Sequence, residues 1–110
     1  MIYSALLIRY TCLVLLSGTY LVAANQAPPK VHKIEIRQMQ FVPAMLEVQR
    51  GDTVIFTNKD IVVHDATARS GKAWKSPALV PGDSWRLVID KSADYFCSFH
   101  PVMKGRIVVR

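Results

Sequence analysis

Apolar and polar residues alternate with a period of two in several segments downstream of residue 30. Ile34 and Ile36 alternate with charged neighbours, and Leu46 and Val48 alternate with polar ones. The same pattern recurs in residues 53–57 and 84–90. Because successive side chains of a strand point to opposite faces, this alternation predicts half-buried β-strands. An apolar segment at residues 107–109 predicts a further strand near the end of the chain.

Turn sequences separate these predicted strands. Arg50-Gly51-Asp52 and Pro81-Gly82-Asp83 are both typical of tight turns. Pro81-Gly82 suits a type II turn, because proline presets φ and glycine tolerates a positive φ. Residues 69–80 are irregular and are expected to form a loop, with at most a helical turn. Residues 25–110 contain no long amphipathic helix pattern, so the sequence predicts an all-β, antiparallel-rich sandwich or barrel.

The first 24 residues differ from the rest of the chain. Arg9 is their only charged residue, apolar segments flank it, and Val22-Ala23-Ala24 has the small residues of a cleavage site. This pattern predicts a secretory signal peptide at 1–24, a linker at 25–30 and one domain at 31–110. A membrane anchor is the alternative, but the apolar core is short and Arg9 interrupts it. We therefore expect a bacterial-type periplasmic protein, without stable membrane insertion after cleavage.

Cleavage changes both the charge and the cysteine count. Lys and Arg fall from 14 to 13 while Asp and Glu stay at 8, which leaves a net charge of +5. This charge is spread along the chain and no nucleic-acid motif is present, so we expect no nucleic acid and at most acidic partner surfaces. Cys12 is lost with the signal, and Cys97 remains alone. A lone exported cysteine is a free thiol, an intermolecular bridge or a metal ligand.

Cys97, His100 and Met103 follow one another at three-residue intervals, and His64 ends a separate strand-like segment. One thiolate and two imidazoles form the trigonal ligand set of a blue copper centre, and a weak axial methionine completes it. His32 lies beside Lys33 in a polar register and is expected to be exposed. The ligand types therefore favour a site for one copper ion.

Two other chemistries remain open at this point. Structural zinc sites use four Cys or His ligands, whereas this chain offers one cysteine, and methionine is a poor zinc ligand. A catalytic Cys–His pair needs a group that orients the base, and no Asn or Asp is clearly placed for that role. Neither alternative explains Met103.

Residues 31–110 resemble the cupredoxins, the small blue copper proteins, and most of all their amicyanin, plastocyanin and pseudoazurin branch. The resemblance implies a cupredoxin-like Greek-key β-sandwich or barrel of about seven to eight strands. Five segments carry it: Phe41-Val42-Pro43 with Leu46-Glu47-Val48, Gly51-Asp52-Thr53-Val54, Asn58-Lys59-Asp60 with His64, Leu79-Val80-Pro81-Gly82, and the loop from Tyr95 to Gly105.

The family resemblance also implies a function. His64, Cys97 and His100 would be the equatorial ligands and Met103 the axial ligand of copper that cycles between Cu(I) and Cu(II). The protein would be a monomeric carrier of single electrons between a donor and an acceptor redox protein, and not an enzyme. A periplasmic copper-binding protein of copper homeostasis or resistance is the alternative.

Residues around the ligands acquire roles by the same resemblance. Phe99, Pro101 and Val102 would form an apolar docking patch beside His100, with loop packing as the alternative. The family commonly has Asn after the first histidine, where this chain has Asp65. The backbone N–H of Asp65 would donate to the Cys97 thiolate, and the Asp65 carboxylate would accept a hydrogen bond from Ser98.

Overall fold

The computed structural model describes residues 27–70 and 72–110. The predicted signal peptide, Cys12 and the first two linker residues lie outside this range. Linker residues 27–30 are exposed and have no regular structure. Within the described part of the chain, no helix is long and apolar enough to cross a membrane.

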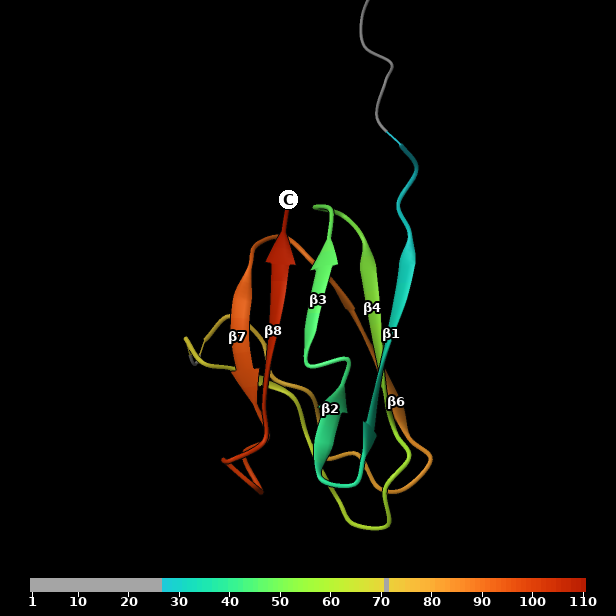
Figure 1. Cartoon of the computed structure of the whole chain (residues 1–110), viewed down its shortest axis with the longest axis vertical. Coiled ribbons are helices and arrows are strands. Elements are labelled where there is room, and N and C mark those ends of the chain that lie inside the picture. Colours follow the sequence, from blue (N-terminus) through green and yellow to red (C-terminus); the bar gives the residue numbers. More distant parts are fainter. Residues whose placement is uncertain (1–26, 71) are drawn as a thin grey trace, which may run out of the picture.

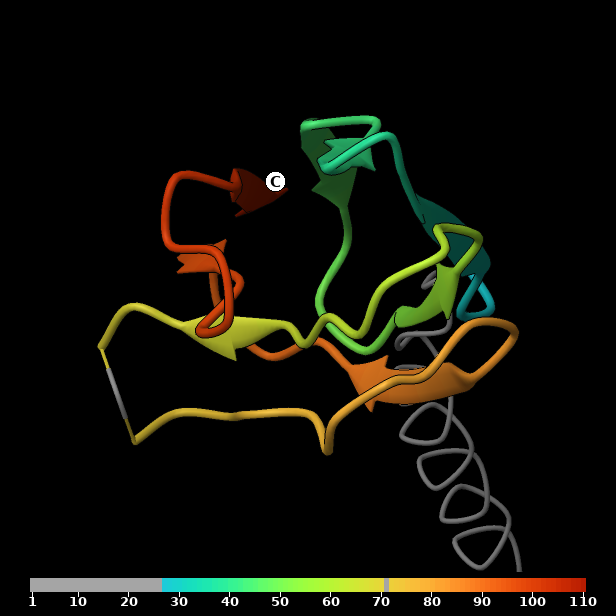
Figure 2. The ribbon, with the colours of Figure 1, turned by 90° about the horizontal axis from the view of Figure 1, so that it is seen from below.

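In the described residues the chain folds into two four-stranded sheets that face one another (Figures 1 and 2). The first has the order β2-β1-β4-β6 and the second β3-β8-β7-β5. This arrangement confirms the all-β sandwich of seven to eight strands expected from the sequence. The strands are β1 Val31–Arg37, β2 Gln40–Val42, β3 Met45–Val48, β4 Thr53–Asn58, β5 Thr67–Ala68, β6 Ser84–Val88, β7 Ala93–Phe96 and β8 Lys104–Val109.

Strand pairing is more mixed than the alternation pattern indicated. β1 pairs with β4 in parallel, and β3 pairs with β8 in parallel, while the other neighbouring pairs are antiparallel. The loop expected at residues 69–80 is confirmed for the described part of that segment, which contains no helical turn. This part holds bends and isolated bridges, because it pairs back on the chain at Thr67–Lys75 and His64–Leu79.

The core fills the space between the sheets. Ile34, Ile36 and Phe56 from the first sheet, and Tyr95 and Ile107 from the second, are fully buried. Each such side chain contributes about 1.5–3 kcal/mol by leaving water. Trp74 and Trp85 are partly buried and pack against this core, with their ring centroids 6.1 Å apart.

The loops that carry the predicted ligands emerge at one end of the sandwich. The loop after β4 and the loop after β7 lie at the lower end of Figure 1, whereas the C-terminus lies at the upper end. The alternating strands therefore form a rigid support, and their connections bring His64 close to Cys97 and His100.

Asp52 stabilises the opposite end of the sandwich. Its buried carboxylate accepts hydrogen bonds from the backbone N–H groups of Lys30 and Gln49, both at 2.9 Å. His32 Nε2 lies 2.8 Å from the same carboxylate, so this histidine is half-buried rather than exposed as expected. The backbone N–H of Gln49, then the backbone N–H of Lys30 and then the ring of His32 lower the pKa of Asp52 to about 2.

This contact predicts a specific dependence of stability on pH. In the unfolded protein, an Asp carboxyl has a pKa of about 3.9. Because the pKa of Asp52 is lower in the folded protein, its ionised carboxylate stabilises the fold above that pH. The stabilisation is lost as the pH falls from about 4 towards about 2. We expect Asp52→Asn to lower the melting temperature at pH 7 by several degrees, and by less near pH 2.5. Thermal unfolding of both proteins at the two pH values checks this, and an equal difference at both would contradict it.

Candidate metal centre

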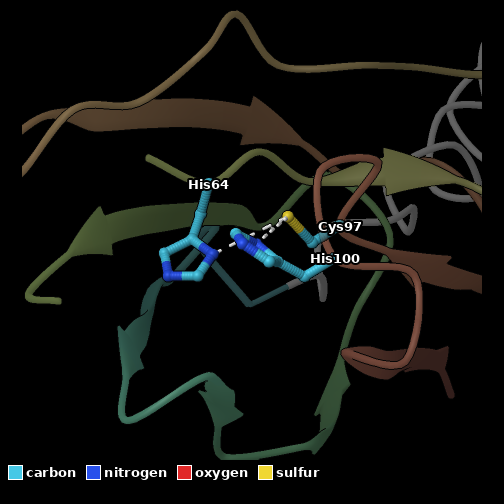
Figure 3. A group of neighbouring side chains, drawn as sticks. All are labelled: His64, Cys97 and His100. Carbon is cyan, nitrogen blue, oxygen red and sulfur yellow. Dashed lines mark hydrogen bonds between the residues drawn. The ribbon is translucent and has the colours of Figure 1, made fainter. Parts of the chain in front are cut away.

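Three side chains from two loops converge on one point (Figure 3). The Cys97 Sγ atom lies 3.7 Å from His64 Nδ1 and 3.8 Å from His100 Nδ1. The three ligand atoms all lie within 4.8 Å of one another. The centroids of the two imidazole rings are 4.9 Å apart. The fold therefore brings His64 to the thiol of Cys97 and the imidazole of His100, which follow it by more than thirty residues in the sequence.

These separations fit trigonal coordination of a metal ion. With metal–sulfur bonds of about 2.3 Å, metal–nitrogen bonds of about 2.05 Å and an angle near 120°, sulfur and nitrogen lie about 3.8 Å apart. The two Sγ–Nδ1 distances agree with this value. A set of one thiolate and two imidazoles is the donor set that favours copper.

A tight loop between β7 and β8 carries two of these side chains and Met103. The His100 N–H donates to the Cys97 carbonyl at 3.2 Å, and the Met103 N–H donates to the His100 carbonyl at 2.9 Å. The Cys97 N–H in turn donates to the Met103 carbonyl at 3.1 Å. Cys97 is fully buried and Met103 is 3% exposed. The three backbone bonds thus close the loop and bring Met103 back beside Cys97.

His64 is held by pairing with Leu79. The His64 N–H donates to the Leu79 carbonyl at 3.1 Å, and the reverse bond is 2.8 Å long. The buried Asn58 side chain donates to the carbonyls of Val62 and Leu79, and it accepts from the Asp60 N–H. Because one amide satisfies three backbone groups, the loop that leads to His64 has a defined shape.

Asp65 joins the two ligand loops. Its N–H donates to Cys97 Sγ at 3.4 Å, and its carboxylate accepts from the Ser98 N–H at 2.7 Å. The hydroxyls of Ser98 and Thr67 also donate to the carboxylate. The Asp65 side chain is buried, so three donors compensate a charge that lies beside the thiol.

Asp60 lies against the outer nitrogen of His64. Its Oδ2 atom is 2.9 Å from His64 Nε2, and its side chain is 12% exposed. The hydrogen bond with His64, and then the N–H groups of Met39 and Ile61, hold the pKa of Asp60 below its usual range. From the sequence, Asp60 was identified only as part of a family motif. No local pattern signalled this contact, because a four-residue spacing brings side chains together only on a helix and residues 58–64 are not helical.

Exposed apolar residues flank the half-buried His100 in the sequence. Phe99 is 48% exposed and Val102 is 84% exposed, and Pro101 between them is also exposed. On the His64 loop, Ile61 is 88% exposed. Such exposure of large apolar residues on functional loops is typical of a surface that contacts another molecule.

The arrangement does not favour thiol catalysis, even though Asp60 supplies an orienting group that we did not identify from the sequence. Cys97 has no exposed surface, so a substrate carbonyl cannot reach Sγ without rearrangement of the loops. Two imidazole nitrogens that lie within 4.8 Å of the sulfur and of each other also resemble a coordination sphere more than a nucleophile with one base.

Comparison with known proteins gives consistent matches. A family model described as a cupredoxin-like domain matches residues 7–109. Amicyanin-alpha of Methylorubrum extorquens is 26% identical over 113 residues, which cover 97% of this chain and 95% of that protein. Amicyanin of Paracoccus denitrificans is 29% identical over 82 residues, which cover 69% of this chain and 63% of that protein.

Solved structures with a similar fold include both small proteins and an enzyme. A purple cupredoxin from Nitrosopumilus maritimus has a TM-score of 0.67 and 30% identity, covering 72% of this chain and 99% of that one. A copper-containing nitrite reductase from Thermus scotoductus has a TM-score of 0.68 and 30% identity. The match covers 82% of this chain but 24% of the reductase, so the likeness concerns one part of that enzyme.

Proposed function

Since the chain belongs to the cupredoxin-like family, we propose that it is an exported blue copper protein that carries single electrons between redox proteins. The observation that carries this proposal is the convergence of His64, Cys97 and His100 at sulfur–nitrogen distances of 3.7 and 3.8 Å. Similar proteins include two amicyanins and a purple cupredoxin. Export depends on the signal peptide predicted at residues 1–24, followed by release into a periplasm.

His64, Cys97 and His100 would hold one copper ion, with Met103 as a weak fourth ligand. When bound, copper supplies one-electron exchange between Cu(I) and Cu(II). The protein residues supply a fixed geometry. Cys97 and His64 are fully buried, which excludes water from the thiolate, and the loop hydrogen bonds limit movement of the ligands. Since four donors fill the site, it offers no position for a substrate, and we propose that the protein is not an enzyme.

Electrons would enter and leave through His100, because this residue is half-buried whereas His64 has no exposed surface. Phe99, Pro101 and Val102 would form the docking patch around it. Exposed Lys59 and Lys104 border the two ligand loops, which favours partners that carry acidic groups around an apolar centre.

Redox titration tests this function. The copper-loaded protein is reduced with ascorbate and reoxidised with ferricyanide while a chelator competes for copper. We expect one electron per copper over repeated cycles, with the metal retained, because the ligands are buried. Release of copper to the chelator on each reduction would contradict electron carriage and favour copper homeostasis.

Asp65→Asn is expected to raise the reduction potential. The carboxylate places a negative charge beside the thiolate, which favours Cu(II), and the amide removes that charge. A unit charge roughly 7 Å away at an effective dielectric constant near 20 corresponds to about 100 mV. Thr67→Val removes one donor to Asp65 without changing the charge and serves as the control. Voltammetry of both variants checks this, and an unchanged or lower potential in Asp65→Asn would contradict it.

A further inference from the structure

The Asp60 carboxylate contacts three other residues, two through their backbone N–H groups and one through its ring. Its Oδ1 atom accepts the Ile61 N–H at 2.9 Å. Its Oδ2 atom accepts the Met39 N–H at 3.0 Å and contacts His64 Nε2 at 2.9 Å. The Asp60 N–H donates to Asn58 Oδ1 at 2.8 Å, which fixes the carboxylate's own backbone. The carboxylate is thus held from several directions and is not free to rotate away from His64.

The Met39 contact reaches an unusual turn. Gln38 and Met39 link β1 to β2, and both have positive φ values, of 52° and 62°. Two consecutive left-handed residues other than glycine are uncommon and unfavourable, so surrounding contacts must hold them. The bond from the Met39 N–H to Asp60 is such a contact, and it ties this turn to the ring of His64.

We propose that Asp60 is a positioning residue that joins His64 to the β1–β2 turn and fixes the orientation and tautomer of its ring before any metal binds. His64 Nδ1 faces Cys97 and must be free of a proton in order to bind a metal. The proton of the neutral ring then resides on Nε2, where it is donated to Asp60. Asp60 therefore selects the form of His64 that can act as a ligand.

The first test uses the metal-free protein. Long-range proton–nitrogen NMR spectra report which ring nitrogen of His64 carries the proton. We expect the wild-type ring to be a single Nε2–H tautomer, and Asp60→Ala to give a mixture of tautomers. Asp60→Asn preserves the size of the side chain and should give an intermediate result. A single Nε2–H tautomer in Asp60→Ala would overturn the proposal, and Asp60→Asn decides it if the alanine variant does not fold.

The second test measures copper affinity by competition with a chelator, and this consequence rests on the proposed function. Loss of an outer partner of a ligating histidine typically lowers metal affinity about 10–100-fold, which we expect for Asp60→Ala. Asp83→Asn is the matched control, because it removes the same charge from an exposed turn where the carboxylate accepts the Val80 N–H. An equal loss in Asp83→Asn, or no loss in Asp60→Ala, would overturn the proposal. Failure of the wild-type protein to bind copper would contradict the proposed function, while the NMR result would still decide the role of Asp60.

Discussion

Replacing Cys97 with serine is expected to abolish the intense visible absorption of the copper-loaded protein. That absorption requires charge transfer from a thiolate to copper, and Cys97 is the free cysteine that the described residues contain. Serine has nearly the same shape, so the buried position is still filled and the fold should persist. Because a coordinating atom is removed, copper affinity should fall by more than the roughly 100-fold seen when an outer-sphere partner is lost.

Met103→Leu provides the matched comparison for Cys97→Ser. It removes a sulfur atom from the same loop but leaves the thiolate and both imidazoles. The visible absorption should shift but persist, since Met103 is proposed as the weak axial ligand only. Absorption spectra with copper, together with circular dichroism without it, separate loss of the site from loss of the fold. Retention of the band in Cys97→Ser would show that the thiolate is not a ligand.

Gly105→Ala is expected to destabilise the protein by about 3 kcal/mol or more, at the upper end of the range for overpacking. A Cβ atom at position 105 would lie 2.2 Å from Tyr95 Cζ and 2.3 Å from its hydroxyl oxygen. Tyr95 cannot easily move, because its fully buried ring packs against Phe41 and Phe56 at centroid distances of 4.7 and 5.4 Å. The loss would be a large part of the stability of a small domain.

A double-mutant cycle tests the assigned cause of this loss. If the clash with Tyr95 is responsible, Gly105→Ala should be much less harmful in a Tyr95→Leu background, where the ring is absent. Urea unfolding of the four proteins gives the coupling energy. Additive effects would contradict the steric explanation. Val108→Ala, at a half-buried position of the same strand, serves as a comparison for ordinary substitutions in β8.

The sequence predicted the long strands and the residues of the candidate metal centre, because each leaves a strong local pattern. β1 and β4 alternate with period two, and the positive φ of Gly82 agrees with the turn expected at Pro81-Gly82. The candidate ligands were identifiable because copper favours particular donor types, and those types are scarce in this chain. The convergence of His64 on the Cys97 loop could be inferred only by chemistry, since the two are far apart in sequence.

Other features depend on tertiary contacts and were not visible in the sequence. β2 and β5 have three and two residues, which is too short to show a period, and they form because longer strands lie beside them. The contact of His32 with Asp52 joins two segments that the alternation pattern treats separately. The contact of Asp60 with both His64 and Met39 likewise requires the β1–β2 turn to lie beside the ligand loop.

Titration of the metal-free mature protein with Cu(II) tests the central claim most directly. The geometry around Cys97 predicts an intense visible band that grows linearly and saturates at one copper per protein, with the narrow copper hyperfine splitting of a blue centre in electron paramagnetic resonance. Zn(II) bound at the same site should give no such band. Saturation by Cu(II) without an intense visible band would contradict a copper centre built on His64, Cys97 and His100.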